Sequence, residues 1–418
     1  MTASAPDQQP SGQNIPDPQT PELTVQVCVI GAGPVGATLA CRLAAAGIDT
    51  AILDHAPLPP MEHPDFDGRA YAIAAGSMKL LLDAGVWPLL PHRPCPIDSI
   101  LITDGRPGQP PSPLSLEFGP QDSTEPFGWM VEARALRVAL NRALHNSPHI
   151  RLFAPATADI TRSDDHTLII TSTGQRIRAA LVVAADGRQS RTRSKAGIPV
   201  TRLPYGQSGI VCAIAHEHPH DNSALEHFLP GGPFAQLPMS GTDEHPNLSA
   251  IVWSEKDAVA KRLFSLPDDT FTREIHRRMG DRLGRITPVG RRWTYPLSAQ
   301  YAQSYTAPRL ALIGDAAHGI HPIAGQGLNL GFRDVISLST LLISAAEKGQ
   351  DPGNSTLLTQ YQRDCRPRNM MMFAATDALD RLFSNDNPVL RLARDIGIAG
   401  VGRMPRLRRA FVRHAMGV

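Results

Sequence analysis

The feature that most constrains the fold of this chain is a glycine-rich turn, Gly31-Ala-Gly33-Pro-Val-Gly36, set between a strand and a helix. The flanking residues predict a βαβ unit, with a β-branched strand over 25–30, a helix over 35–46 and a second strand over 50–53. Such a unit requires a parallel sheet with a crossover helix, so the N-terminal part of the chain is predicted to be an α/β domain.

Each glycine of this turn has its own role in a dinucleotide site. Gly31 permits the tight turn, Gly33 lets the backbone approach a pyrophosphate, and Gly36 lets helix and strand pack closely. The start of the helix then faces the phosphate charge. Asp54 ends the second strand 23 positions after Gly31, where a carboxylate accepts hydrogen bonds from an adenosine ribose. The pattern predicts a bound dinucleotide but does not separate NAD from FAD.

A second segment, 309–334, favours a flavin. It reads as a strand, then Gly314-Asp315, a loop with little side-chain bulk, and a helix. Gly325 and Gly327 allow backbone to approach a flat ring, because no Cβ intrudes. The positive end of the helix near 327–329 would stabilise the negative charge of a reduced flavin. The alternative for this segment is a plain glycine-rich loop between a strand and a helix.

Composition limits the other function classes. The 418 residues predict two or three domains, and the net charge of +2 gives no argument for nucleic acid. Residues 1–21 are rich in proline and polar residues and are expected to be a disordered tail rather than a targeting signal. No apolar run has the length of a transmembrane helix, and no His, Cys or Asp spacing suggests a metal. Five scattered cysteines indicate free thiols in a reducing cytoplasm.

Three segments in a fixed order carry a family resemblance: 67–77 with Asp67-Gly-Arg69, 181–190 with Asp186-Gly187, and the Gly314-Asp315 segment. In this order they resemble single-component, FAD-dependent aromatic hydroxylases of the para-hydroxybenzoate hydroxylase type. Within that class the chain looks like the ubiquinone-biosynthesis hydroxylases, on the segments 228–238, 321–331 and 412–417. The resemblance covers about residues 24–417.

The resemblance implies an activity. It implies an FAD monooxygenase that hydroxylates the ring of a lipid-soluble polyprenylated phenol in ubiquinone biosynthesis. NADH or NADPH would dock transiently to reduce the FAD, and O2 would then form the C4a-hydroperoxide that transfers oxygen. One alternative is a related flavin monooxygenase or epoxidase acting on another aromatic or an alkene. Another is a non-catalytic prenyl-binding protein of the same fold.

The resemblance also implies roles for individual residues. Gly314 and Asp315 would bind the flavin ribityl chain, and Arg69 and Arg134 would contact the FAD pyrophosphate or nearby backbone. Asp186 and Gly187 would lie near the pyrophosphate and the docked nicotinamide. The flavin edge would be lined by Pro322, Gly325, Gln326, Gly327, Leu328 and Asn329. The chain departs from the family at Asp54, where the longer Glu is usual.

No obligatory protein base follows from the sequence. An electrophilic oxygen donor does not require one, since phenol deprotonation can come from the substrate's surroundings or from water. His318 and His321 flank the flavin loop, and their simplest interpretation is loop histidines that bond to backbone. The cysteines are interpreted as small core residues, as Cys28 in the middle of a strand illustrates.

The fold class that the resemblance implies is α/β. It comprises a Rossmann-like FAD-binding domain, an interleaved and mainly antiparallel β-sheet substrate domain, and C-terminal helices. The expected pieces are a tail over 1–21, the FAD-binding domain over 22–96, 128–200 and 298–370, the substrate domain over 97–127 and 201–297, and a C-terminal helical segment over 371–418. Phe234, Leu237, Pro238 and Met239 are expected to build the floor of the substrate pocket. The alternative for this stretch is a proline-rich edge loop.

The C-terminal segment 389–418 mixes apolar residues with seven arginines. A helical interpretation places an apolar stripe beside cations, which suits a helix lying on anionic lipid. The alternative is a salt-bridged helix that packs on its own domain. The expected location is the cytoplasm, peripheral on the inner face of the cytoplasmic membrane. The resemblance adds the other proteins of ubiquinone biosynthesis as partners.

Overall fold

The computed structural model describes residues 22–59, 68–113, 115–320 and 325–383, together with residues 404, 408, 409, 412, 413 and 416. The predicted tail over 1–21, Pro322, His321 and most of the segment 389–418 therefore lie outside the described residues.

The first sheet is the predicted parallel sheet. Its strands run in the order β17 (Thr306–Ala307), β18 (Leu310–Leu312), β11 (Arg176–Ala184), β1 (Leu23–Ile30), β2 (Thr50–Leu53) and β8 (Ile150–Phe153). All neighbours except β17 and β18 pair in parallel, and β9 (Ala158–Arg162) and β10 (Thr167–Thr171) add an antiparallel hairpin beside β11. Parallel sheets are normally covered by helices, so their strands are buried and mostly apolar. The central strand β1 follows this rule.

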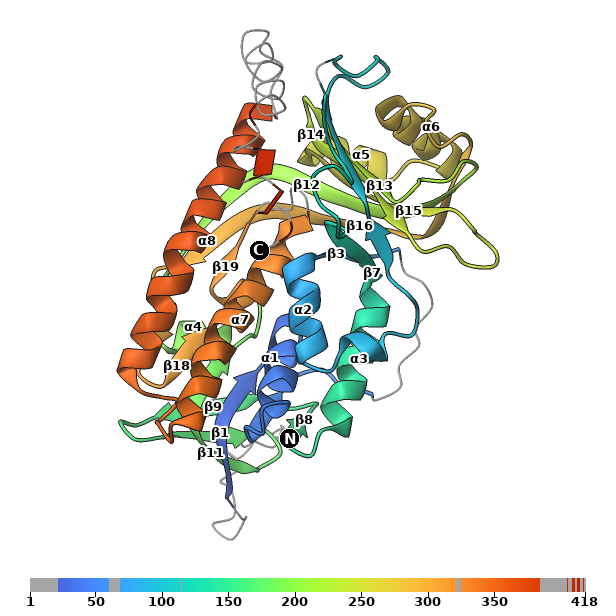
Figure 1. Cartoon of the computed structure of the whole chain (residues 1–418). Helices are drawn as coiled ribbons and strands as arrows, with labels where there is room; N and C mark the ends of the chain where they lie inside the picture. Colours follow the sequence, from blue (N-terminus) through green and yellow to red (C-terminus); the bar gives the residue numbers. More distant parts are fainter. Residues whose placement is uncertain are drawn as a thin grey trace, which may run out of the picture.

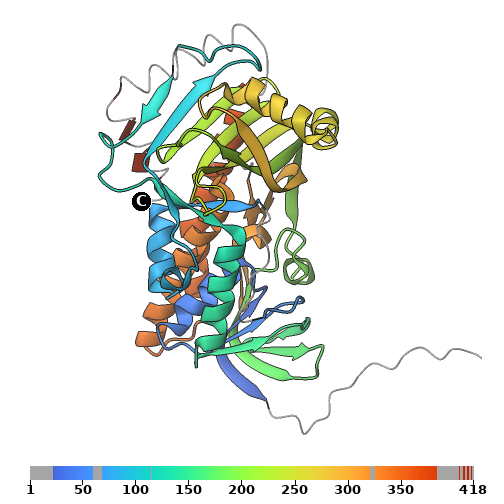
Figure 2. The same cartoon turned by 90° about the vertical axis from the view of Figure 1, so that its right-hand side faces the viewer.

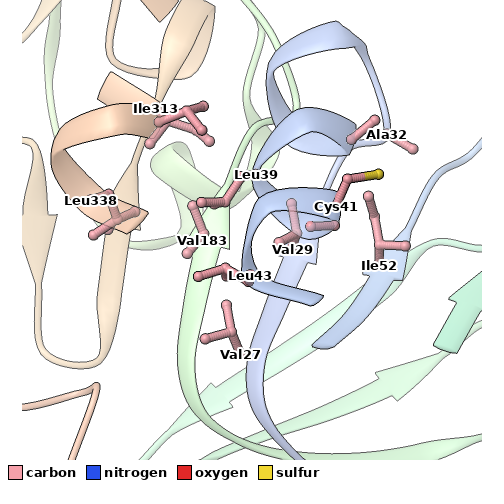
Figure 3. Packing of buried hydrophobic residues seen from close by; sticks show 14 of the residues in the cluster. Val27, Val29, Ala32, Leu39, Cys41, Leu43, Ile52, Val183, Ile313 and Leu338 are labelled. Atoms are coloured by element: carbon pink, nitrogen blue, oxygen red, sulfur yellow. The ribbon is translucent and has the colours of Figure 1, made fainter. Parts of the chain in front are cut away.

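Helices form the layer over this sheet (Figure 1). They are α1 (Pro34–Ala44), α2 (Ala75–Asp83), α3 (Ala133–Asn146), α7 (Gln326–Glu347) and α8 (Ser355–Phe383). Leu39 and Leu43 of α1 lie over β1 and β11, where they meet Val29 and Val183 (Figure 3). Each of these side chains is fully buried, which contributes about 1.5–3 kcal/mol apiece.

The second large sheet is mainly antiparallel, as predicted. Its order is β19 (His318–Gly319), β16 (Ile286–Ala302), β12 (Val200–His216), β15 (Leu248–Lys256), β14 (Gly232–Met239), β13 (Ser223–Leu229), β5 (Ser99–Asp104) and β6 (Leu116–Phe118). Only β13 and β5 pair in parallel among its described strands. Helices α5 (Asp257–Phe264) and α6 (Asp268–Met279) cover its outer face (Figure 2), where Phe234, Trp253 and Phe271 pack together.

A small sheet joins the two halves. It consists of β3 (Ala70–Ala74), β7 (Gly128–Glu132) and β4 (Cys95–Ile97). The remaining short elements are η1 (Trp87–Leu89), α4 (Arg191–Lys195) and η2 (Gly314–Ala316). The strands of the two large sheets alternate along the chain, so each sheet is built from segments on both sides of the other in sequence.

Three features differ from the sequence-based expectation or refine it. The stretch with Phe234 is not a proline-rich edge loop but a strand, since β14 lies inside the sheet between β15 and β13. Helix α8 runs without interruption across the expected boundary at 370/371. Among the described C-terminal residues, Val412 and Met416 are buried and Arg408 pairs with Asp122 at 2.6 Å, so this part packs on its own domain.

Helix α7 is long and apolar enough to cross a membrane by composition alone, with a mean hydropathy of 1.2. More than half of that stretch, 56%, is buried inside the protein. It contacts α1, α2 and α8, and its predicted stripe of Leu330, Asp334, Leu338 and Leu342 is buried. The helix is therefore part of the protein core.

A buried carboxylate ties α7 to the turn at Gly314. Asp334 is fully buried, and its Oδ2 accepts hydrogen bonds from the Gly314 backbone N–H at 3.0 Å and from His318 Nε2 at 2.5 Å. Its Oδ1 accepts a bond from the Asn369 side chain on α8 at 2.9 Å. The sequence had suggested that His318 bonds to backbone. In the structure its side chain bonds to a carboxylate instead. Burial alone would lower the pKa of His318, but the charge and hydrogen bond of Asp334, with the field of Asp315, raise it.

This network predicts a pH-dependent stability. The pKa of His318 is higher in the folded state than its value near 6.5 in the unfolded chain. Protonated His318 therefore stabilises the fold fully at pH values below the unfolded-state pKa. This contribution is lost as the pH rises through the folded-state pKa. We expect this contribution to the free energy of unfolding of the natural protein to fall as pH rises above about 6.5, and His318→Gln to remove that component. Urea titrations at each pH measure it.

The matched control is His149→Gln, because His149 also pairs with an aspartate, Asp49 at 2.9 Å, but on the surface. Its pH dependence should follow that of the natural protein. Parallel curves for His318→Gln and the natural protein would show that the buried pair does not titrate in this range.

Candidate active site

A cavity of about 750 Å³ lies between the glycine-rich turn and the antiparallel sheet. One side consists of backbone-rich segments from β3, from the turn at Gly33, from Gly187 and Arg188, from Gly314 and Asp315, and from the start of α7. The opposite side consists of side chains from β12, β13, β14, β15 and β16. The two halves of the molecule therefore meet at one mostly apolar cavity with few polar groups, as small-molecule sites usually are.

Two of the three fingerprint glycines, Gly31 and Gly36, have the structural roles that their spacing predicted. Gly31 has φ +105°, and a Cβ there would meet the Ala185 carbonyl oxygen at 2.4 Å. A Cβ on Gly36 would meet the Gly31 oxygen at 2.0 Å, so this position packs α1 against the turn. Gly33 differs, because a Cβ there would meet nothing within 4 Å. Two glycines thus build the turn, and the third leaves open space beside the cavity.

Two helix N-termini border this cavity. Helix α1 begins after Gly33 and α7 after Gly325, and neither first turn is capped by a side chain. The N-terminal turn of a helix leaves N–H groups without intrahelical partners and carries positive dipole charge. Pro34 and Val35 of α1 and Gly327 and Leu328 of α7 line the cavity. This arrangement suits FAD, with a pyrophosphate at one helix and an electron-rich ring edge at the other.

The start of α7 is fixed to the neighbouring strand by Asn329. Its side-chain oxygen accepts a bond from the Ala74 N–H at 2.9 Å, and its side-chain nitrogen donates to the Ala72 carbonyl at 2.8 Å. The side chain is buried and does not line the cavity, so it positions the helix start rather than lining the flavin edge. Gly325 adopts φ +64°, which favours glycine, and Gln326 is the first residue of α7.

Asp54 supports the glycine-rich turn directly. Its Oδ2 accepts a bond from the Ala32 N–H at 2.7 Å, and its Oδ1 accepts one from the Ala56 N–H at 2.9 Å. Each carboxylate oxygen retains further acceptor capacity for a ribose hydroxyl. The shorter side chain therefore holds the turn and remains beside the predicted ribose position.

The predicted role of Asp186 needs correction. Its carboxylate accepts bonds from Ser190 Oγ, Thr192 Oγ1 and the Thr192 N–H at 2.5–3.0 Å, so it organises the start of α4. It is not among the described residues that line the cavity, whereas Gly187 is. Arg188 takes the exposed position instead: its guanidinium donates to the Ser298 carbonyl and hydroxyl at 2.7 and 2.8 Å and lies 3.5 Å from Asp315 Oδ2.

Two buried donors hold the loops of this side together. Gln300 donates to the carbonyls of Arg188 and Asp315 at 3.1 and 2.8 Å. Arg193 donates to the carbonyls of Ala316 and Arg188 at 2.8 and 3.1 Å. Together they fix the end of β11 beside the turn after β18, which places Asp315 at the cavity.

The two predicted phosphate arginines are placed elsewhere. Arg69 is exposed, and its guanidinium stacks over the Trp293 ring at 4.4 Å. Arg134 donates to Glu132 Oε2 at 2.6 Å. The two segments do meet, since the Ala133 N–H donates to the Arg69 carbonyl at 3.0 Å. Neither arginine is among the described cavity residues, so the predicted pyrophosphate contact has no support in this geometry.

The substrate wall also needs correction. Successive residues of a strand point to opposite faces, so only alternate residues of β14 reach the cavity. These are Pro233, Ala235 and Leu237. Phe234 is fully buried against Trp253 on the other face. Of the four predicted residues Leu237 lines the cavity, while Phe234, Pro238 and Met239 do not.

Several cavity residues were missed from the sequence. Arg188 directly follows the Gly187 turn, and this position was a usable signal. Tyr295 on β16 had no such signal, and neither had Gln300, which holds the loops beside the cavity and does not line it. Glu226 was the clearest missed signal, because it interrupts the apolar run Ala-Leu-Glu-His-Phe-Leu. Burial raises the pKa of the Glu226 carboxyl to about 7 and also raises that of Tyr295.

None of the five cysteines is among the described residues that line the cavity. All five cysteines are free and buried, and burial raises the pKa of Cys28, Cys41, Cys95, Cys212 and Cys365 to about 12. Thiols with such pKa values stay protonated and unreactive at neutral pH. Within the described ranges no cluster of His, Cys, Asp and Glu could hold a metal ion.

Comparisons with known proteins agree with this geometry. A family model for an FAD binding domain matches residues 24–376. The chain is 46% identical over 392 residues to the ubiquinone hydroxylase UbiL of Rhodospirillum rubrum, covering 94% of this chain and 89% of that protein. It is 33% identical over 397 residues to 3-demethoxyubiquinol 3-hydroxylase of Escherichia coli, covering 94% and 98%.

Among solved structures, p-nitrophenol 4-monooxygenase PnpA of Pseudomonas putida superposes with a TM-score of 0.75 at 18% identity, covering 94% of this chain and 99% of that one. This likeness confirms the α/β fold with its interleaved antiparallel sheet. The family model and the two relatives confirm the flavin family that the order of motifs predicted. The chain belongs to the FAD-binding family of hydroxylases that includes the ubiquinone hydroxylases.

Proposed function

We propose that this protein is an FAD-dependent monooxygenase that hydroxylates the ring of a polyprenylated phenol in ubiquinone biosynthesis, with NADH or NADPH as cosubstrate. One observation carries the proposal: two uncapped helix N-termini, from α1 and α7, open onto a cavity whose far wall is an apolar sheet. The named activities of the two relatives give the substrate class.

The residues divide the work of binding. FAD, when bound, accepts electrons from NAD(P)H and activates O2. The N–H groups at the start of α1 would hold its pyrophosphate, beside the open space at Gly33. Asp315, which lines the cavity and is 52% exposed at its side chain, would accept bonds from the ribityl hydroxyls. The start of α7 would stabilise negative charge on the reduced ring.

The sheet wall would receive the substrate ring. Val211, Ala235, Leu237 and Val252 line this wall, and apolar side chains of this kind exclude water from the reacting atoms. A reactive oxygen species is protected from hydrolysis and side reactions in such surroundings. The wall therefore fits an aromatic ring with an apolar prenyl chain better than a charged metabolite.

We also propose that the protein works at the inner face of the cytoplasmic membrane, because a polyprenylated substrate resides in lipid. In the described part of the C-terminal segment, Arg409 and Arg413 are exposed and Met404 is 55% exposed. Arg413, unlike Arg408, Val412 and Met416, is exposed and positioned to face anionic lipid, with the apolar Met404 side chain exposed in the same segment.

A glycine pair tests the cofactor site. Gly33→Val adds bulk only to open space, at φ −62° and ψ 174°, which any residue adopts. We expect the apo-protein to fold with an unchanged melting temperature and FAD affinity to fall by about tenfold or more, or about 1.4 kcal/mol. Gly36→Ala should instead impair folding, since its Cβ would lie 2.0 Å from the Gly31 oxygen. Flavin fluorescence and thermal melting measure both. Full flavin occupancy in Gly33→Val would contradict the pyrophosphate assignment.

Gene deletion tests the reaction. Cells lacking this protein should accumulate a prenylated ring intermediate that lacks one oxygen relative to the next one in the pathway, because a single hydroxylation is lost. Mass spectrometry of extracted quinones identifies the intermediate and therefore the ring position. Complementation with the natural gene is the control. Normal quinone levels with no such intermediate would argue against the pathway assignment.

Charge reversal tests the membrane proposal. Arg413→Glu should lower cosedimentation with vesicles containing anionic phosphatidylglycerol by about fivefold or more, since one basic residue near the surface contributes about 1 kcal/mol and the new negative charge adds repulsion. The control is Lys261→Glu, which makes the same charge change on an exposed residue of α5. An equal loss of vesicle binding in both variants would show only a general charge effect and would contradict the proposed membrane-binding surface.

A further inference from the structure

Glu226 lies in the middle of β13, on the face that looks into the cavity. Its neighbours in the strand point the other way: Leu225 packs in the cluster with Phe234 under α5 and α6, and His227 bonds to Thr103 at 2.6 Å. Since side chains alternate along a strand, the Glu226 carboxyl is directed to the cavity side.

Register places Glu226 in a row across the substrate wall. Val211 of β12 pairs with Val252 of β15, Val252 pairs with Ala235 of β14, and Ala235 pairs with Glu226. Three strand spacings separate the two ends of this row, or roughly 14 Å. Within the part of this row that lines the cavity, Glu226 therefore follows three small apolar side chains; beyond it the row continues to Ile102 of β5.

The Glu226 carboxyl makes no polar contact with the described part of the protein. In the part of the chain that the structure describes, no hydrogen bond or ion pair reaches Glu226, although the residue is only 9% exposed. The other charged residues among the described cavity lining, Arg188 and Asp315, lie 3.5 Å from one another on the opposite side. Burial raises the pKa of Glu226 to about 7, because no neighbouring cation offsets the desolvation.

A buried carboxyl without partners destabilises a fold, so its position calls for a ligand that completes it. Polar groups in an apolar pocket are few, and they fix the orientation of the ligand. A prenylated phenol has one strong hydrogen-bond donor, its ring hydroxyl, and an otherwise apolar surface. The carboxyl can accept that hydrogen bond whether it is ionised or neutral.

We propose, resting on the function proposed above, that the Glu226 carboxyl accepts a hydrogen bond from the ring hydroxyl of the phenol and thereby selects the ring carbon that faces the flavin. Glu226 is then a substrate-binding residue that determines the position of hydroxylation. The apolar row through Ala235 and Val252 supports the flat ring, and Glu226 fixes its rotation within the plane of the wall.

The test compares three variants of the full-length holoenzyme. Glu226→Leu removes the acceptor, Glu226→Gln keeps an amide oxygen as acceptor, and Glu255→Gln is the control. Glu255 is also 9% exposed, but it lies on β15 next to the cavity residue Ser254 and is paired with Arg278 at 3.6 Å. The probe is phenol carrying a geranyl chain on the carbon next to the hydroxyl. The readouts are hydroxylated product per NAD(P)H oxidised, product isomer ratio, probe Kd from the flavin absorbance change, flavin content and melting temperature.

We expect Glu226→Leu to bind FAD normally and to melt no lower than the natural protein, because an unpartnered buried carboxyl is removed. Its product yield per NAD(P)H should fall by about tenfold, the factor for one hydrogen bond to a charged group, and its isomer ratio should broaden. Glu226→Gln should restore most of the yield, and Glu255→Gln should leave it unchanged.

Other outcomes separate the two claims. A natural enzyme that hydroxylates the probe, with Glu226→Leu equal to it in yield, isomer ratio and Kd, would overturn the assignment of Glu226 while leaving the proposed function intact. A flavin-loaded natural enzyme that neither binds nor hydroxylates the probe would overturn both. Loss of yield in Glu255→Gln equal to that in Glu226→Leu would show a general packing effect and would also overturn the assignment.

Discussion

The site depends on the close contact between helices α1 and α7. Val35 of α1 lies against two glycines, and a Cβ on Gly331 would come within 2.7 Å of it, while one on Gly314 would come within 3.2 Å. Only this approach brings the N-termini of both helices to the same cavity. The positive ends of two helix dipoles then act on one ligand, which a single fingerprint turn does not achieve. The large antiparallel sheet closes the remaining side.

Carboxylates in this protein serve two purposes. Asp54, Asp186 and Asp334 accept bonds from backbone or side-chain donors and hold the turns around the cavity in place. Glu226 and Asp315 instead face the cavity, at the sheet wall and at the loop side respectively. A preorganised cavity requires both kinds, because the loops that line it must themselves be held in place by surrounding residues.

Much of the fold was predictable because its signals are local. The βαβ unit at Gly31, the helix after Gly325 and the strands near 210–215 and 249–253 follow from residues adjacent in sequence. The errors at the site have a common physical cause. Asn329 bonds to Ala72 and Ala74 across about 255 positions, and Arg69 stacks on Trp293, so their side chains are engaged by partners that no local pattern contains. Phe234 was misplaced because the strand in which it lies, β14, was not recognised as a strand.

The sequence by itself determined the cofactor-binding turn, the order of motifs and therefore the family, since glycine spacing limits what a backbone can do. Only the tertiary structure decided which polar residues face the cavity and which hold the frame. The reason is that a strand offers two faces and a hydrogen bond needs a partner. Which face is buried, and which partner is near, depends on strand register and helix packing between segments hundreds of residues apart. Glu226 illustrates this, because its carboxyl faces a cavity whose opposite side is formed by Gly33 and Gly314, which lie far from it in the chain.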